Sequence, residues 1–246
     1  MKLLKGWFGE KKTALTIWTW LPSNKYHRFH NIIIPSRNGT TQIDHLLVSE
    51  YGIFIVETKN RTGWIYGSEE QSTWTQVLRS KKYTFQNPLR QTYRQKKVLA
   101  EFLRIYPNKI QTVIFFVGDC KFKTKMPDNV LKHRLSTHIK QYKNKVFSQE
   151  YVLDIIHQLE EFTEKSNLTK RDHMRSLNDR HSSTTKCPRC GSALVERKAR
   201  NGKNAGNKFL GCSNYPGCKF TRSLWKYIIT NATTPISSNH TSSTST

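Results

Sequence analysis

Residues 41–60 read TQIDHLLVSEYGIFIVETKN, and the fold prediction starts from them. Two runs rich in β-branched residues, joined at Gly52, predict a β-hairpin. Side chains alternate along a strand, so Glu57 and Lys59 point to the same face. A neighbouring strand could bring Asp44 beside Glu57, where two carboxylates would bind Mg²⁺ and the lysine would face a reacting phosphate. The hairpin therefore carries the groups that are needed to cut nucleic acid.

Composition limits the partners that this chain can have. Its 41 Lys and Arg residues outnumber 17 Asp and Glu residues, and the formal net charge is +24. A charge this large predicts a polyanionic partner, with nucleic acid the first candidate and an anionic membrane surface the second. Residues 14–21 are apolar, but no run approaches the roughly 18 consecutive apolar residues of a membrane-spanning helix. We therefore expect a cytoplasmic protein, nucleoid-associated if bacterial, without stable membrane association.

Periodicity and turn residues predict the remaining secondary structure. Asn87 and Pro88 suit the N-cap and the first position of a helix, which we expect to run to Tyr106. The buried face of this helix should contain Leu89, Tyr93, Leu99, Leu103 and Tyr106. Further helices are expected over 9–21 and 151–162, a turn-rich segment over 36–41, and strands over 26–35 (ended by Pro35), 42–49, 53–58, 63–67, 73–78 and 111–117. This order of elements predicts an α/β domain with a mixed sheet.

Changes in composition divide the chain into parts. Residues 1–165 carry the expected α/β domain. Residues 166–186 are polar and charged with few core-forming side chains, which predicts a linker. Residues 187–227 contain two cysteine pairs. Residues 228–246 are nearly all Ser, Thr and Asn, which predicts a disordered tail.

Several short blocks of the first domain occur in the order that is typical of a known family. They are GE at 9–10, TQIDH at 41–45, ETKN at 57–60, GWIYG at 63–67, Trp74 and NPLRQ at 87–91. Together, across residues 9–103, they resemble the nuclease-related domain (NERD), a branch of the PD-(D/E)XK nuclease superfamily. The resemblance implies a restriction-endonuclease-like mixed β-sheet flanked by helices, and DNA cleavage that depends on a divalent metal.

The resemblance also implies roles for individual residues. Asp44 and Glu57 match the carboxylates that bind Mg²⁺ or Mn²⁺, and Lys59 matches the catalytic lysine. Gln91 matches a glutamine on the second helix, and Glu10 matches an acid on the first helix. Each of these last two has a simpler alternative. The glutamine could cap or pack the helix, and an acid in the first turn of a helix is favourable without any catalytic duty.

Other side chains near these blocks have structural interpretations. His45 must point away from Asp44 on its strand, which indicates a packing role before that of a general base. Trp64 and Trp74 are expected to pack on the sheet, with base stacking as the alternative. Gln95 stands where this family would lead us to expect a histidine, a departure that bears on activity more than on the metal site.

Four of the five cysteines form two close pairs near the carboxyl end: Cys187 with Cys190, and Cys212 with Cys218. In a cytoplasmic protein such pairs favour a metal over disulfides. Four thiolates on two tight turns suit one tetrahedral Zn²⁺, which would contribute folding free energy to a segment with little core. A zinc ion held by four protein thiolates has no place for a substrate water, so we expect a structural role. Cys120 is interpreted as a buried spare cysteine.

The segments CPRCGSAL at 187–194 and KFLGCSNYPGC at 208–218 surround these cysteines. They resemble the four-cysteine zinc finger of bacterial type IA topoisomerases, which implies a DNA-binding accessory module and not topoisomerase activity. Nine Lys or Arg residues and the single acid Glu196 lie between positions 187 and 226. The side chains expected to contact nucleic acid are Arg189, Lys208, Tyr215, Lys219, Arg222 and Trp225.

These features lead to a divalent-metal-dependent DNA nuclease that a zinc ribbon targets to DNA, with RNA not excluded. A homodimer would suit cutting of both strands. The alternatives are a DNA-binding protein with a dormant site, an accessory factor that docks on DNA-processing machinery, and, more remotely, a membrane-surface protein.

Overall fold

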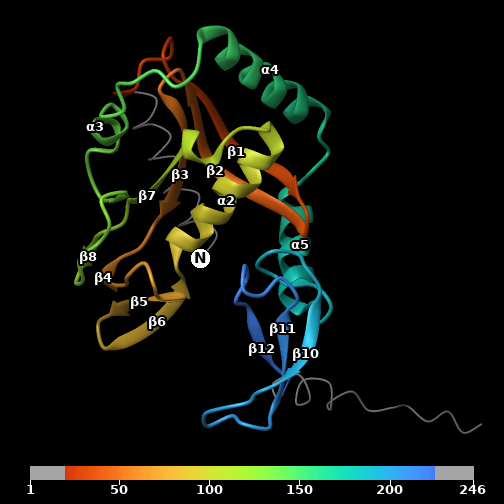
Figure 1. The fold of residues 1–246 in the computed structure, drawn as a ribbon. Helices are drawn as coiled ribbons and strands as arrows, with labels where there is room; N and C mark the ends of the chain where they lie inside the picture. The colour runs from red at the N-terminus through yellow and green to blue at the C-terminus, as the bar shows by residue number, and fades with distance from the viewer. Residues whose placement is uncertain (1–19, 225–246) are drawn as a thin grey trace, which may run out of the picture. The chain divides into compact units, whose positions relative to one another are not determined.

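The computed structural model describes residues 20–224, which divide between Met174 and Arg175 into two compact units (Figure 1). The helix expected over 9–21 and the tail expected over 228–246 lie largely or entirely outside the described residues. The prediction of an α/β fold with mixed sheets and helices, followed by a small cysteine-rich ribbon, is confirmed.

The first unit is built on a five-stranded mixed sheet in the order β1-β2-β3-β7-β9. Strands β1 and β2 pair antiparallel, as do β2 and β3, whereas β3, β7 and β9 are parallel neighbours. The bounds are β1 His27–Ser36, β2 Gly39–Ser49, β3 Gly52–Lys59, β7 Ile110–Phe116 and β9 Val130–Leu131. Strand β3 is central and is almost entirely buried, as its run of apolar residues leads one to expect.

Helices cover both faces of this sheet. On one face, α2 (Pro88–Leu103) and α4 (Gln149–Lys165) contribute apolar residues to a shared core with β1, β2 and β3. On the other face, the short helix α3 (Leu135–Ile139) and the chain around Leu21 and Tyr26 pack on β2, β3 and β7. A short 3₁₀ helix, Pro107–Lys109, connects α2 to β7.

A second, smaller sheet has the order β6-β5-β4-β8 (Figure 1). Its strands are β4 Gly63–Tyr66, β5 Thr73–Leu78, β6 Lys81–Gln86 and β8 Cys120–Phe122. One face packs through Ile65 and Trp74 on Phe116 of β7, so this sheet extends the core beyond the end of β3. Trp74 is fully buried and stacks on Phe116, which agrees with the packing role expected for it.

Backbone hydrogen bonds join the loop after β3 to the loop after β7. The N–H of Val117 donates to the carbonyl oxygen of Lys59 at 3.1 Å, and that of Gly63 to Asp119 at 2.9 Å. Between them, a Cβ atom placed on Gly118 would lie only 2.0 Å from the carbonyl oxygen of Arg61. The glycine therefore permits a close approach that holds the residues after Lys59.

Several boundaries differ from the sequence-based expectation for physical reasons. β1 continues through Pro35, which pairs with Thr40 and is tolerated because β1 is an edge strand. The turn is thereby shortened to residues 37–38. Helix α2 ends at Leu103 because Arg104 adopts a left-handed conformation and its N–H caps two carbonyl oxygens of the last turn.

The expected buried face of α2 is wrong at two positions. Tyr93 is 58% exposed and Tyr106, beyond the helix, is 77% exposed. The residues that the helix buries are Pro88, Thr92, Gln95, Leu99, Ala100 and Leu103. Thr92 is buried in place of its neighbour Tyr93, and the buried face of the helix also includes the polar residue Gln95.

The second unit contains an antiparallel ribbon, β10-β11-β12. Its strands are Leu194–Lys198, Lys208–Cys212 and Thr221–Ser223. Helix α5 (Lys170–Ser182) spans the boundary between the units, within the segment for which the sequence predicts a linker. In the second unit, Arg222 donates to the carbonyl oxygens of His181 and Ser183, which ties the ribbon to the end of this helix.

Candidate active site and metal centre

Asp44 and Glu57 lie where β2 separates from β3. Pairing of these strands runs from Ser49 and Gly52 to His45 and Val56, and the next residue on each strand is one of the two acids. Asp44 reaches across the fork, because its Oδ2 accepts a hydrogen bond from the backbone N–H of Thr58 at 3.1 Å. The structure therefore brings the two carboxylates to one point of the sheet, as the sequence predicts.

A kink in β2 accompanies this fork. Leu46 and Ile43 both enter the core under α2 although they lie three positions apart, so the alternation of faces breaks at Asp44 and His45. On β1 the ladder skips Asn31, which has a positive φ of 56°. Asn tolerates this left-handed conformation better than most residues do. The irregularity gives Asp44 its place at the edge of regular pairing.

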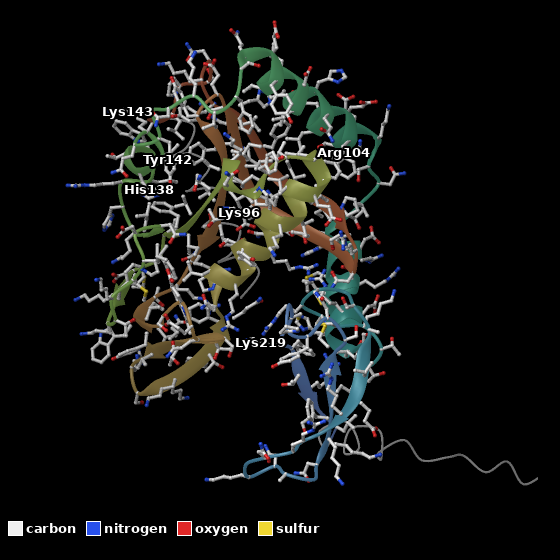
Figure 2. All side chains as sticks on the ribbon, in the orientation of Figure 1. Lys96, Arg104, His138, Tyr142, Lys143 and Lys219 are labelled. Atoms are coloured by element: carbon white, nitrogen blue, oxygen red, sulfur yellow. The ribbon has the colours of Figure 1, made fainter. Side chains whose placement is uncertain are left out.

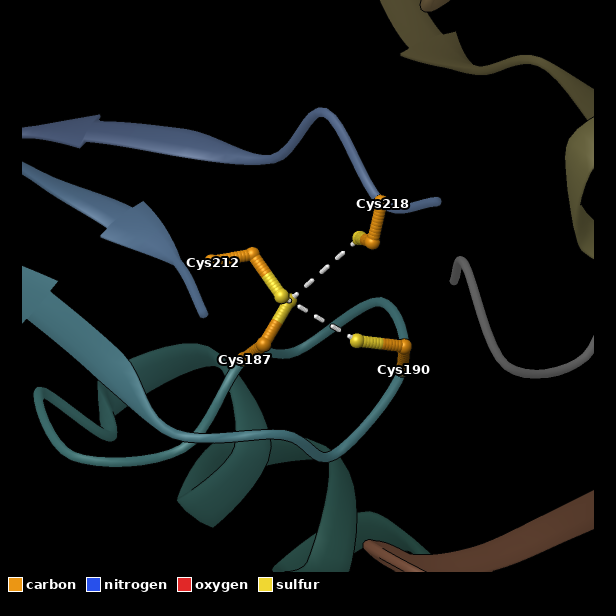
Figure 3. A group of neighbouring side chains, drawn as sticks. All are labelled: Cys187, Cys190, Cys212 and Cys218. Carbon is orange, nitrogen blue, oxygen red and sulfur yellow. Dashed lines mark hydrogen bonds between the residues drawn. The ribbon is translucent and has the colours of Figure 1, made fainter. Parts of the chain in front are cut away.

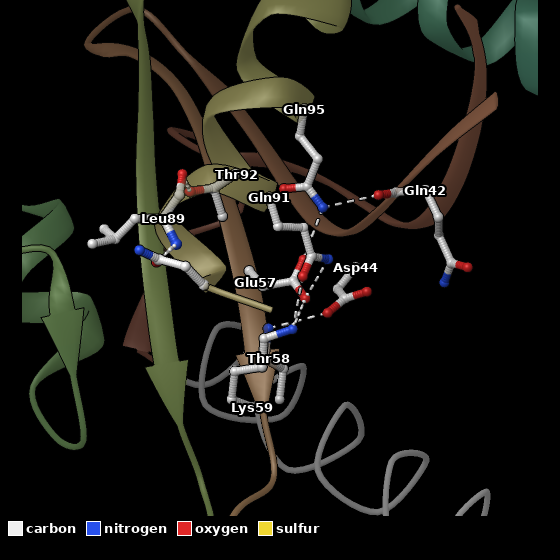
Figure 4. A network of polar contacts seen from close by, with 10 residues as sticks. Gln42, Asp44, Glu57, Thr58, Lys59, Leu89, Gln91, Thr92 and Gln95 are labelled. Atoms are coloured by element: carbon white, nitrogen blue, oxygen red, sulfur yellow. Dashed lines mark hydrogen bonds and ion pairs between the residues drawn. The ribbon is translucent and has the colours of Figure 1, made fainter. Parts of the chain in front are cut away.

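Glu57 is a buried carboxylate with three donors (Figure 4). Its Oε1 accepts from Lys59 Nζ at 2.6 Å and from Gln91 Nε2 at 2.8 Å. Its Oε2 accepts from Gln95 Nε2 at 2.8 Å. The side chain of Glu57 is 3% exposed and that of Lys59 is 17% exposed. A buried charge is costly unless it is paired and hydrogen-bonded, and all of these conditions are met here.

Helix α2 supplies both glutamines. Gln91 and Gln95 lie one turn apart on the same side of the helix, so both reach the carboxylate of the strand below (Figure 4). Gln91 also accepts from Lys59 Nζ through its Oε1 at 3.0 Å, which links the lysine and the acid. Gln95 Nε2 donates in addition to the carbonyl oxygen of Gln42 on β2 at 3.0 Å.

Gln95 is not among the site residues that the sequence predicts, in which it stands only as a departure from the family pattern. The signal that could have found it is the spacing of four residues from Gln91. Glu10, the remaining residue expected at this site, lies outside the described residues.

The donor set fits a hard divalent cation. Mg²⁺ prefers carboxylate and amide oxygens, which Asp44, Glu57 and Gln95 can offer. The Oε1 atom of Gln95 is buried and has no hydrogen-bond partner among the described residues. This orphaned acceptor belongs to the side chain whose Nε2 donates to Glu57, and a cation or its bound water would satisfy it.

His45 pairs with Val56 of β3, whose side chain belongs to the core on the face of the sheet away from α2. Its Nδ1 is 2.7 Å from Nδ1 of His30 on β1. Burial, together with the nearby His30, lowers the pKa of His45 to about 3. A neutral, buried imidazole at this place contributes to packing.

The four cysteines of the second unit converge (Figure 3). Their sulfur atoms all lie within 4.8 Å of one another, with 3.8 Å between Cys187 and Cys218 and 3.3 Å between Cys190 and Cys212. Ligands about 2.3 Å from a tetrahedral zinc ion lie roughly 3.8 Å apart. The cluster therefore has the size and the ligand type of a structural zinc site.

Turns and electrostatics support this assignment. Gly191, with φ of 82°, follows the first pair, and its N–H donates to the carbonyl oxygen of Cys187 at 2.8 Å. Burial raises the pKa of Cys212 to about 12. Burial also acts on Cys190, but hydrogen bonds from Ser192 and from neighbouring cysteines lower its pKa to about 7. A bound Zn²⁺ would supply the positive charge that a buried group of thiolates lacks.

The side chains expected to contact nucleic acid differ in their exposure and in the contacts that they already make. Tyr215 is 59% exposed and Lys219, labelled in Figure 2, is exposed, so both are accessible within this unit. Lys208 forms an ion pair with Glu196 at 2.7 Å, and Arg222 is engaged with α5. Arg189 is exposed on the first cysteine turn, and Trp225 lies outside the described residues. Cys120, the fifth cysteine, is buried in the first unit, as expected.

Comparison with known proteins assigns both units. Residues 5–117 match the family model of the nuclease-related domain, and residues 184–227 match that of the topoisomerase DNA-binding C4 zinc finger. The chain thus carries a nuclease-related domain followed by a topoisomerase-type zinc finger, a class of module associated with DNA binding. No solved structure shows significant similarity to the chain.

Two curated proteins are similar to parts of the chain. An uncharacterized protein of Bacillus anthracis is 45% identical over 96 residues, which cover 39% of this chain and 45% of that protein. DNA topoisomerase 1 of Archaeoglobus fulgidus is 54% identical over 39 residues, 16% of this chain and 5% of that enzyme. The chain therefore spans less than half of the length of either relative. No helix in residues 20–224 is long and apolar enough to cross a membrane.

Proposed function

We propose that this chain is a divalent-metal-dependent deoxyribonuclease whose zinc ribbon holds it on DNA. The observation that carries the proposal is the network at the fork of β2 and β3, in which a buried glutamate contacts a lysine and two glutamines beside a second acid. A contribution to stability alone does not explain this arrangement, because apolar residues that replace a buried ion pair often leave a protein equally or more stable.

Each side chain has a task in phosphodiester hydrolysis. Asp44 and Glu57 would hold Mg²⁺ or Mn²⁺, which would lower the pKa of a bound water and stabilise charge on the phosphate. Lys59 can orient the attacking water or offset the charge that develops on the phosphoryl oxygens. Gln91 contacts both Lys59 and Glu57, so it sets the position of the lysine relative to the acid.

The zinc ribbon supplies affinity in this proposal. Its segment has nine basic residues against one acid, and the exposed ring of Tyr215 can stack on an unpaired base. Tethering this module to the nuclease-related domain raises the local concentration of DNA near the catalytic residues.

The test is a cleavage assay with zinc-loaded protein on supercoiled, linear and single-stranded DNA, with and without Mg²⁺ or Mn²⁺. We expect cleavage only with the divalent ion. Glu57→Gln should reduce cleavage to background, and Lys59→Met should reduce it by at least about 100-fold. The matched control is Glu101→Gln, since this acid lies on α2 but forms an exposed ion pair with Arg37.

A second measurement separates catalysis from metal binding. Binding of Mn²⁺, followed by electron paramagnetic resonance, should be lost in Glu57→Gln and retained in Lys59→Met.

One observation favours a second candidate function, a DNA-binding protein with a dormant site. Both oxygens of Glu57 are already satisfied by protein donors. If the wild-type protein binds DNA but neither binds Mn²⁺ nor cuts any of the substrates, this second function replaces the first.

A further inference from the structure

The outward face of the small sheet β6-β5-β4-β8 carries an exposed tryptophan among lysines. Cross-strand pairing places Lys82, Val77, Trp64 and Lys121 in one row across the four strands. Residues directly opposite each other on paired strands point to the same face. The other face of this sheet is the one that packs on β7 through Ile65 and Trp74. The row therefore faces away from the core.

Trp64 is not used for packing as Trp74 is. It is 47% exposed, whereas Trp74 on the neighbouring strand is fully buried. Its contact is with Lys123, whose Nζ lies 4.5 Å from the centre of the ring. The expectation that both tryptophans pack on the sheet is thus met by Trp74, while Trp64 leaves much of a large aromatic surface accessible.

The charge around this ring is positive. Lys82, Lys121 and Lys123 are all exposed, and none has an ion-pair partner among the described residues. The segments 61–86 and 119–125, which form this sheet and its loops, hold seven Lys or Arg residues and three acids. An accessible indole flanked by unpaired ammonium groups is complementary to an unpaired base and its adjacent phosphates.

We propose that this face, defined by Trp64, Lys82, Lys121 and Lys123, binds a single-stranded segment of DNA. A base would stack on Trp64, and the lysines would contact phosphates. Duplex DNA does not offer this contact, because its bases are already stacked on one another. The inference deepens the proposed nuclease function and rests on it, since it names an unpaired strand as the form of substrate that this domain contacts.

The face lies close to the candidate active site along the chain. Trp64 is five positions after Lys59, which limits the distance between their Cα atoms to about 18 Å. The intervening loop is held by the hydrogen bonds of Lys59 and Gly63 to residues 117 and 119. A strand on this face would therefore pass within a few nucleotides of the lysine.

The experiment uses the full zinc-loaded chain without Mg²⁺ or Mn²⁺, so that binding is read without cleavage. A labelled oligothymidine with 5-iodouracil at several positions is irradiated with the protein, and the cross-linked peptides are identified by mass spectrometry. We expect a cross-link to Trp64. In fluorescence anisotropy, Trp64→Ala should weaken single-strand binding roughly tenfold and duplex binding by less than about twofold.

The matched control is Tyr106→Ala, which removes a more exposed aromatic ring at a different place on the same unit. It should leave single-strand affinity unchanged. Cross-links confined to other aromatic residues such as Tyr215, or equal effects of Trp64→Ala on both forms of DNA, would overturn the inference. Failure of the nuclease proposal is a separate result, because it appears as absence of cleavage by the wild-type protein with divalent ions.

Discussion

Glu57 is buried in the interior of the first unit, and three side chains donate hydrogen bonds to its carboxylate group. Two of these donors, Gln91 and Gln95, come from one helix, and the third is Lys59 on the same strand. The sequence predicts that Glu57 and Lys59 share a face, since alternation along a strand is a local rule, and that a neighbouring strand could bring Asp44 beside Glu57. It could not assign Gln95, because that contact depends on how α2 packs over β3.

The first prediction concerns a single residue, Gln95, which donates a hydrogen bond to Oε2 of Glu57. Gln95→Leu keeps the volume of the side chain but leaves a buried carboxylate oxygen without its partner. The free energy of unfolding should fall by about 2 kcal/mol, as expected for a lost hydrogen bond to a charged group. Urea denaturation monitored by circular dichroism measures this change. Gln111→Leu, at a glutamine whose bond is exposed, serves as control and should change stability by less than about 0.5 kcal/mol.

The helices and strands differ in how far neighbouring residues in the sequence determine their geometry. Helix α2 begins where Asn87 and Pro88 predict, because capping depends on residues adjacent in sequence. The kink of β2 at Asp44 could not be predicted, since it arises from pairing with β1 on one side and separation from β3 on the other. The exposure of Tyr93 has a related cause: apolar spacing alone did not fix which side of α2 faces the sheet.

Asn87 offers a prediction at the scale of elements. Its Oδ1 caps α2 by accepting from the N–H of Leu89, and its Nδ2 donates to the carbonyl oxygens of Ser68, Glu69 and Gln71. Asp is as good an N-cap as Asn in an isolated helix, but it cannot donate. Asn87→Asp should therefore destabilise the domain by about 2 kcal/mol or more, because this residue is fully buried. A thermal midpoint equal to that of the wild type would show that only the cap matters.

The whole molecule consists of two units with separate cores and different sources of stability. The first unit buries apolar residues on both faces of its main sheet. The buried residues of the ribbon's core are Cys187, Leu194, Leu210, Cys212 and Cys218. A core in which three of five residues are cysteines is too small to fold without a metal.

This difference predicts separate responses to a chelator. Removal of zinc should unfold the ribbon while the thermal transition of the first unit stays within about 2 °C. Atomic absorption should find one zinc per chain in the wild type and in Cys120→Ala, and substantially less in Cys212→Ser. Simultaneous loss of both units on chelation, seen by two-dimensional NMR, would contradict their independence.

Gly118 shows that the geometry of the candidate active site can depend on a residue with no functional group. Any side chain there would collide with the backbone of Arg61, two positions after Lys59. Relief of the collision would require one of the two loops to shift, and their backbone hydrogen bonds link the carbonyl group of Lys59 to Val117. Replacement of this glycine is therefore expected to move the ammonium group of Lys59 while every acid, amide and amine of the candidate site stays intact.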